Sequence, residues 1–388
     1  MLVWWILLVV SLVAIAWYPG YLLRKRPFVV QKVDLNRDCL AGLNYLLNEE
    51  PDKAVDVFIR MLEVDSDTVE THLAVGKLFR KRGEVDRAIR IHQNLIARPQ
   101  LDRAYREQSL FELGQDYLSA GVLDRAEQVF QDVVSIREYA VPALRALLDI
   151  YEREKDWKKA IVTAEKLAAA TRQNMSHVIA HYHCELGEAE AAREQHAKAM
   201  EHLAKALKAD PACARASLLR ARALMHENSH AEALKQLKKI ASQNPDYLSE
   251  AVETLASCYE NLGREDEMVR YFMKILESWP HVPVVLILSD RIRRQKGNRT
   301  AARYVADYVR RFPSLQGLHH FIGLYMSEAE GRAREDLVIL HNLTTRLLAN
   351  KPDYRCVSCG FSGSHLHWQC PGCRQWSMMR PMHCLEPA

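Results

Sequence analysis

A spacing of about 34 residues recurs along this chain and limits what it can fold into. Gly42 and Gly76 are 34 residues apart, and so are Ala54 and Ala88. Further along, four prolines are spaced by 34, 35 and 33 residues: Pro211, Pro245, Pro280 and Pro313. A period of this length is typical of stacked repeats, in which each unit buries its apolar face against its neighbours. We therefore expect an array of repeats rather than one compact core.

A small residue recurs at one position of most units: Ala54, Ala88, Ala126, Ala160, Ala199, Ala233 and Ala301. A small side chain lets two helices approach closely. In most units a bulkier side chain four positions later fills the space beside it: Phe58, Phe130, Leu203, Leu237 and Val305. The pattern resembles the tetratricopeptide repeat, a helix-turn-helix unit, over residues 35–350. The resemblance implies an all-α superhelical solenoid of about nine units.

A solenoid of this kind presents an extended concave surface, which is suited to holding polypeptide. The first helix of each unit usually lines that surface. The residues predicted to contact a client protein are therefore Leu43, Leu73, Lys77, Arg80, Phe111 and Gln115. Two alternatives stay open. The apolar members could pack in the core instead, and the basic run of Lys77, Arg80, Lys81 and Arg82 could be a solvated helix face.

Charge and motifs argue against two functional classes. Lys and Arg total 53 against 49 for Asp and Glu, a balance of +4 that is too small to predict nucleic acid as a partner. The chain has neither a phosphate-binding glycine loop nor a nucleophile elbow. His181 and His183, like the adjacent His319 and His320, are interpreted as packed or solvated side chains. We predict that the protein is not an enzyme.

The first stretch of the chain is long, apolar and uncharged. Residues 2–23 would span about 33 Å as a helix, enough to cross a bilayer core. Three basic residues follow at once, at positions 24–26. We predict a transmembrane anchor over residues 1–23, a basic juxtamembrane linker over residues 24–34, and the rest of the chain in the cytoplasm. The alternatives are a cleaved signal peptide, with a cleavage-like Ala-Ile-Ala at residues 14–16, and a buried globular helix.

Nine cysteines are present, and four of them form two Cys-x-x-Cys pairs. The other five are scattered, which indicates reduced thiols rather than a disulfide framework. Cys356, Cys359, Cys370 and Cys373 can close a tetrahedral metal site, with zinc favoured and iron as the alternative. The spacing is similar to that of rubredoxin and zinc-ribbon knuckles. It predicts a rubredoxin-like metal-binding domain over residues 354–380.

The metal is expected to stabilise this domain, because so few residues cannot bury enough surface to fold alone. Little chain separates it from the last repeat, so we predict that it docks on the final helices and caps the array. Trp368 and Trp376 flank the second cysteine pair and are the predicted apolar contacts. His365 and His367 are spare, since four thiolates already complete the site.

The order of the three parts, an anchor, a repeat array and a four-cysteine knuckle, is rare. It resembles the lipopolysaccharide assembly protein B family of Gram-negative bacteria. Local segments carry the same resemblance: "DKAVDVFIRML", "LFRKRGEVDRAIRIHQ", "GRAREDL" and "YRCVSCGF…HWQCPGCRQWS". The family's metal ligands carry over to the four paired cysteines alone.

The resemblance implies a function at the bacterial inner membrane. Members are anchored adaptors that restrain lipopolysaccharide synthesis, and they work with the membrane protease FtsH to degrade the cytoplasmic deacetylase LpxC. The anchor would contact other inner-membrane lipopolysaccharide regulators, and the repeats would hold the client. Two alternatives remain. One is a scaffold for lipopolysaccharide synthesis or transport enzymes that promotes no degradation, and the other is a rubredoxin-type electron carrier.

Overall fold

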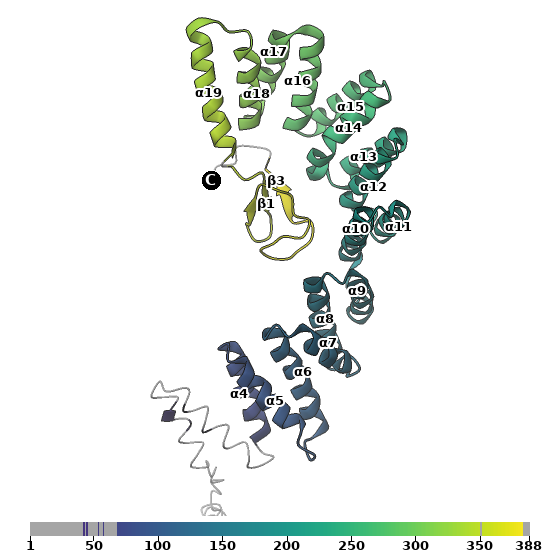
Figure 1. The fold of residues 1–388 in the computed structure, drawn as a ribbon, viewed down its shortest axis with the longest axis vertical. Helices are drawn as coiled ribbons and strands as arrows, with labels where there is room; N and C mark the ends of the chain where they lie inside the picture. The colour runs from purple at the N-terminus through teal and green to yellow at the C-terminus, as the bar shows by residue number, and fades with distance from the viewer. Residues whose placement is uncertain are drawn as a thin grey trace, which may run out of the picture. The chain divides into compact units, whose positions relative to one another are not determined.

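Figure 1 shows the fold in a computed structural model of the chain. The structure describes residues 68–349 and 351–382, and the single positions 42, 44, 45, 53 and 57. The predicted anchor, the linker and Leu43 lie outside the described residues, as does most of the first predicted repeat. No described helix combines the length and the apolar character needed to cross a membrane. The chain divides into two compact units, Met1–Val122 and Leu123–Ala388.

The described part of the first unit holds three helices: α4 (Val69–Lys81), α5 (Val85–Ile96) and α6 (Arg103–Ser119). Leu73, Phe79 and Ile91 form the buried core between α4 and α5. Gly76 lies where these two helices meet, because a Cβ atom there would come within 2.5 Å of the His92 ring. The absent side chain makes room for the imidazole, which explains why this position of the repeat needs a glycine.

A polar network joins the three helices of the first unit. Asp116 on α6 is buried; it accepts a hydrogen bond of 2.7 Å from Arg80 and pairs with Nδ1 of the buried His92. Arg80 also donates to Glu112 at 2.6 Å. A buried carboxylate is stable only when it is paired and hydrogen-bonded, so these contacts fix the packing of the helices.

The second unit continues as helices that pack on one another in sequence order. They are α7 (Leu123–Val133), α8 (Ala140–Glu154), α9 (Trp157–Thr171), α10 (Ser176–Ala192), α11 (His196–Ala209), α12 (Ala214–His226), α13 (His230–Gln243), the short η2 (Pro245–Leu248), α14 (Ser249–Asn261), α15 (Glu265–Ser278), α16 (Val282–Lys296), α17 (Asn298–Arg311), α18 (Leu315–Met326) and α19 (Gly331–Ala349). The prediction of an all-α repeat array is confirmed for the described residues.

The predicted helix-crossing positions are confirmed where the structure describes them, whereas Ala54 and Phe58 lie outside the described residues. The alanines at these positions are at most 1% exposed: Ala88, Ala126, Ala160, Ala199, Ala233 and Ala301. The bulkier residues four positions later are also buried: Phe130, Leu203, Leu237 and Val305. Met268, which replaces the small residue in one unit, is buried too, so that crossing accommodates a flexible side chain.

A small antiparallel sheet follows α19. Its strands are β1 (Tyr354–Cys356), β2 (Ser362–Gly363) and β3 (Met379–Pro381), in the order β2-β1-β3. Tyr354 pairs with Gly363 on one side and with Pro381 on the other. We call residues 354–382 the metal knuckle. Its interior is formed by Cys356, Cys370 and Met379, so the cysteines themselves make up much of its core.

Candidate metal centre and its docking surface

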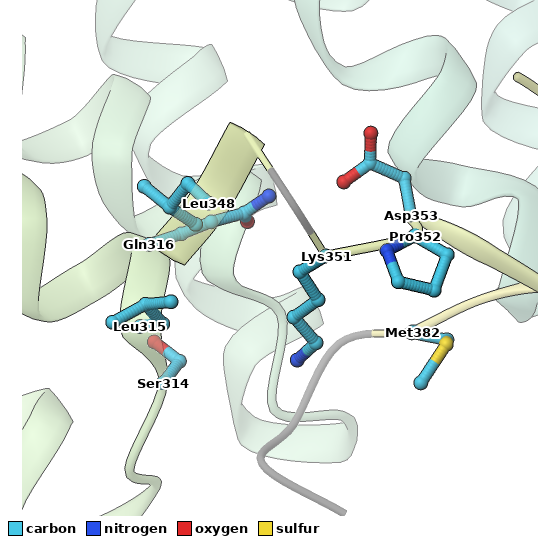
Figure 2. A pocket seen from close by; sticks show the side chains of 8 residues that line it. All are labelled: Ser314, Leu315, Gln316, Leu348, Lys351, Pro352, Asp353 and Met382. Atoms are coloured by element: carbon cyan, nitrogen blue, oxygen red, sulfur yellow. The ribbon is translucent and has the colours of Figure 1, made fainter. Parts of the chain in front are cut away.

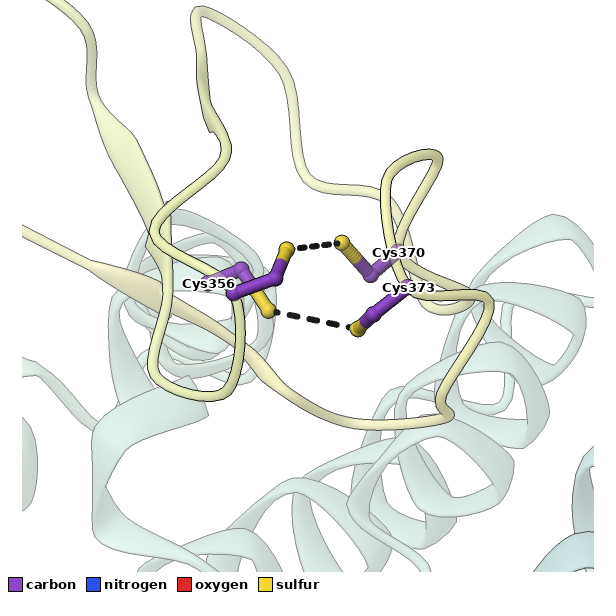
Figure 3. A group of neighbouring side chains, drawn as sticks. Cys356, Cys370 and Cys373 are labelled. Carbon is purple, nitrogen blue, oxygen red and sulfur yellow. Dashed lines mark hydrogen bonds between the residues drawn. The ribbon is translucent and has the colours of Figure 1, made fainter. Parts of the chain in front are cut away.

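Two short turns of the metal knuckle bring four sulfur atoms together (Figure 3). Cys356 ends β1 and Cys359 lies in the turn that follows, whereas Cys370 and Cys373 come from the loop between β2 and β3. The Sγ atoms of Cys356 and Cys373 are 3.7 Å apart, and those of Cys359 and Cys370 are 3.6 Å apart. All four sulfur atoms lie within 4.8 Å of one another.

This arrangement fits one metal ion. A tetrahedral site with metal–sulfur distances of about 2.3 Å has sulfur–sulfur edges of about 3.8 Å. The separations of 3.6 and 3.7 Å agree with that value. Among the described residues, no other group of three or more potential ligands is placed to hold an ion. Four thiolates would close the coordination shell, so the site suits a structural ion rather than a catalytic one.

The two turns reach this geometry in different ways. In the first, Gly360 has a φ angle of +79°, which only glycine adopts without strain. In the second, the left-handed position is taken by Arg374, with a φ of +57°. Gly372 serves another purpose, because a Cβ atom there would lie 3.1 Å from the sulfur of Cys359. Its missing side chain lets the two turns close on each other.

The sulfur atoms differ in their readiness to ionise. Burial opposes ionisation of Cys356, but backbone N–H groups of Cys359 and Ser358 donate hydrogen bonds to its sulfur and lower its pKa to about 6. Burial raises the pKa of Cys370 to about 12. The Cys370 thiol therefore does not ionise readily by itself, and a bound dication would favour its thiolate form.

The metal knuckle docks on helices of the repeats in the second unit, and its Trp376 side chain is buried in the contact. The indole ring stacks on His181 of α10, with centroids 4.9 Å apart and planes 16° apart. It meets Trp157 and Tyr182 edge-on, at 6.0 and 5.9 Å. Ser377 adds a hydrogen bond of 2.7 Å to Nε2 of His181. Three aromatic side chains of the repeats therefore form a socket for one tryptophan.

Glu152 of α8 lies beside this socket, and its carboxylate accepts three hydrogen bonds and one ion pair. Its Oε1 atom receives hydrogen bonds from Tyr182 at 2.6 Å and from Trp376 Nε1 at 3.3 Å. Its Oε2 atom receives one from Gln369 at 3.3 Å and pairs with Arg374 at 3.5 Å. Three of the four groups belong to the metal knuckle. A single carboxylate of the repeats thus accepts hydrogen bonds or ion pairs from three side chains of the docked knuckle.

A buried arginine holds the second tryptophan. The Arg215 guanidinium carbon lies 5.8 Å from the ring centre of Trp368 and 5.9 Å from that of Trp376. Nε and Nη1 of Arg215 have no hydrogen-bond partner, so the indole faces are their main favourable contact. Glu185 binds the other end of the guanidinium at 2.7 Å. On its far side, Trp368 packs against Tyr247 at 4.8 Å.

The sheet itself is bonded to the segment η2–α14. Tyr354 of β1 donates to Glu250 at 2.6 Å. Tyr247 donates to the backbone oxygen of Met379 in β3 at 3.0 Å. Arg380 pairs with Asp246 at 3.2 Å. The docked surface therefore runs over α8, the start of α9, α10, α12, η2 and α14 within the second unit.

The prediction that the metal knuckle docks on the final helices is wrong, whereas the prediction that Trp368 and Trp376 make the contact is confirmed. Figure 2 shows a small cavity between the start of α18 and the residues that follow α19. Its volume is about 20 Å³, and it is lined by Ser314, Leu315, Gln316, Leu348, Lys351, Pro352, Asp353 and Met382. The helices α8–α14 provide both tryptophans with aromatic and charged partners, and we attribute the position of the docked knuckle to these contacts.

Comparisons with known proteins agree with the fold and the site. Residues 354–381 match the family described as a rubredoxin metal binding domain. Residues 71–104, 190–258 and 249–280 match tetratricopeptide repeats. Lipopolysaccharide assembly protein B of Escherichia coli K12 is 38% identical over 378 residues, which is 96% of each chain. The chain belongs to the lipopolysaccharide assembly protein B family. The Haemophilus influenzae Rd member is 35% identical over 381 residues, 95% of each chain.

Solved structures match this chain at low overall similarity. A MamA protein has a TM-score of 0.31 and 21% identity, covering 47% of this chain and 95% of its own. A tetratricopeptide repeat protein from Parabacteroides merdae has a TM-score of 0.31 and 15% identity, covering 72% of this chain and all of its own. We draw no functional conclusion from either.

The predicted client-binding residues that the structure describes lie on α4 and α6 of the first unit. Leu73 is buried in the core of the first unit, and Arg80 is held by Glu112 and Asp116. Lys77 is 39% exposed and pairs with Glu112 at 2.9 Å. Two others, Phe111 and Gln115, are partly exposed on α6. Client binding itself stays a prediction for all of them.

Sequence reasoning missed the residues that receive the metal knuckle. His181 is a packed side chain, as predicted, but it packs against Trp376 rather than inside a repeat. Glu152, Tyr182 and Arg215 had no distinguishing motif. Their partners lie more than a hundred residues away, and no fixed spacing links the two sets. The pair of tryptophans in the knuckle was the one usable signal.

Proposed function

We propose that this protein is a membrane-anchored cytoplasmic adaptor that regulates lipopolysaccharide biosynthesis by promoting FtsH-dependent proteolysis of the LpxC deacetylase. The name of its relatives, lipopolysaccharide assembly protein B, supports the link to lipopolysaccharide. Residues 1–23 would anchor the chain in the bacterial inner membrane, with its bulk on the cytoplasmic side. There it would lie beside FtsH and other inner-membrane lipopolysaccharide regulators.

The observation that carries the adaptor function is the closure of the second unit by the metal knuckle. Gln369 and Trp376 reach Glu152 across 217 and 224 residues of chain. This contact covers the inner helices α8–α14 and fixes their relative positions. A rigid body of this kind is suited to holding a client and a protease partner close together, which raises their effective concentration. We further propose that the bound ion is zinc, which has no redox role.

The client contact is proposed for the inner helices α4 and α6 of the first unit. Lys77, Phe111 and Gln115 are the candidates there with exposed or partly exposed side chains. Leu73 and Arg80 contribute by holding the helices in place, because their side chains are engaged within the unit.

The half-life of LpxC, measured after protein synthesis is stopped in cells with and without this protein, tests the proposal. An adaptor predicts a short LpxC half-life when the protein is present and one several times longer when it is absent. If the half-life were the same in both strains while lipopolysaccharide levels changed, the alternative of a scaffold without a proteolytic role would be favoured. A coloured iron site in anaerobically purified protein would instead favour an electron carrier.

A further inference from the structure

The last described helix of the array leaves an apolar surface uncovered. Thr344 is the only buried residue among the 19 of α19. Five large apolar side chains of this helix are 39% to 58% exposed: Val338, Ile339, Leu340, Leu343 and Leu347. Exposed apolar residues that stand singly are ordinary, but a group of five on one helix marks an interaction surface.

Four of these side chains form one continuous stripe, and Val338 lies outside it. Ile339, Leu343 and Leu347 are four residues apart and lie above one another on a helix, and Leu340 widens the stripe on one side. In a repeat array this is the surface that the next unit would cover. The metal knuckle does not cover it, because its bonds go to α8–α14. The cavity in Figure 2 involves Leu348, which lies beside the packed Thr344 and away from the stripe.

We propose that this stripe binds the same stripe of a second copy of the chain, as an antiparallel helix pair about a twofold axis. A contact of this type must be complementary to itself. Glu335 and Arg346 are both exposed and lie about three turns apart on the same edge of the stripe. An axis near Leu340 places Glu335 of each copy opposite Arg346 of the other. Opposite charges then meet at both ends of the apolar contact.

The size of the stripe determines how strong the dimer is expected to be. A stable interface commonly buries about 800 Å² on each partner, whereas an exposed patch of this kind supplies a few hundred Å². Two α19 helices therefore form a reversible dimer, with a Kd on the order of micromolar. The proposal concerns only this helix and stands independently of the function proposed above.

Sedimentation of the purified full chain in mild detergent, from about 0.1 to 100 µM, tests the dimer. Leu343→Glu places a charge near the middle of the stripe in both copies and should raise the Kd more than about a hundredfold. Val162→Glu is the matched control, because Val162 on α9 is also 49% exposed, as Leu343 is. The control should dimerise as the unchanged chain does. Both variants should melt as the unchanged chain does, since neither position is in the core.

Reversing the charges of Glu335 and Arg346 tests the proposed antiparallel geometry of the dimer most sharply. Glu335→Arg or Arg346→Glu alone creates two like-charge contacts and should raise the Kd about tenfold. Both changes in one chain restore opposite charges across the axis and should return the Kd to its original value. A monomer at the highest concentration, a dimer indifferent to Leu343→Glu, or a double reversal without rescue would each overturn the proposal. So would a chain that binds lipid vesicles through the stripe while remaining monomeric.

Discussion

At the scale of single residues, Cys370 tests the metal centre. Its side chain is fully buried, and its sulfur lies 3.6 Å from that of Cys359. Serine at this position leaves three thiolates and a poorer ligand. Metal binding to small knuckles is worth about 10–16 kcal/mol, far more than a fold of this size can lose. We predict that Cys370→Ser loses its bound ion and that residues 354–382 become sensitive to protease.

Metal analysis of the purified protein measures this directly. His367→Ala is the control, because His367 is exposed in the same domain and lies outside the group of four sulfur atoms. The control should keep one ion per chain. A Cys370→Ser protein that retained a full complement of metal would show that the four sulfur atoms are not the ligands.

His181 makes the docking of the metal knuckle dependent on pH. Burial, together with Arg215 and His177, lowers the pKa of His181 well below its usual range. The neutral ring therefore stabilises the docked state above the unfolded pKa of about 6.5, and this contribution is lost as the pH falls below that value. We predict a decrease in the free energy of unfolding of up to about 1.4 kcal/mol per pH unit below about pH 6.5.

Urea unfolding between about pH 7.5 and 5 measures this slope in the unchanged protein and in His181→Gln. Glutamine does not titrate but keeps a polar group near Ser377. Acid also weakens metal binding, but it does so in both proteins, so the difference between their slopes isolates the histidine. Equal slopes would contradict the prediction.

At the scale of elements, Glu152 decides whether the small sheet stays on the helices. Glu152→Ala leaves the donors of Tyr182, Trp376 and Gln369 without their acceptor, at about 1–3 kcal/mol for each one that stays buried. We predict that the metal knuckle detaches while it keeps its ion, because all four ligands lie within it. Hydrogen exchange of residues 354–382 should rise at least tenfold.

Glu154→Ala provides the comparison, since Glu154 is exposed and lies two positions further along α8. Its exchange pattern should match that of the unchanged chain. Loss of metal together with detachment in Glu152→Ala would show that the knuckle cannot fold away from the helices. Unchanged exchange would show that Glu152 is not required for docking.

Helix pairing was predictable because its signals are local. Small residues at a fixed place in each repeat, such as Ala160 and Ala233, are needed wherever two helices cross, so the period reveals them. The network of Arg80, His92 and Asp116 could not be predicted. Its members look like ordinary helix residues, and only their three-dimensional positions show that they pair with one another in the interior.

At the scale of the whole molecule, the docking site of the metal knuckle could not be predicted from the sequence, and the reason is physical. Because only a short segment joins α19 to the metal knuckle, the sequence suggested that the knuckle packs against α19. The free energy of docking depends instead on the socket around Trp376 and on Arg215 between the two indole rings. These partners are set by tertiary packing, which no periodicity encodes. The anchor, the partners and the client surface remain proposals.

The central claim is that the metal knuckle completes an adaptor whose output is LpxC turnover. The half-life of LpxC in cells whose only copy of this protein carries Cys370→Ser tests it most directly, with protein level and membrane association checked in the same samples. The account predicts an LpxC half-life as long as in cells that lack the protein altogether, although the variant is still present at the membrane. A metal-free variant that gave the same short LpxC half-life as the unchanged protein would contradict the claim.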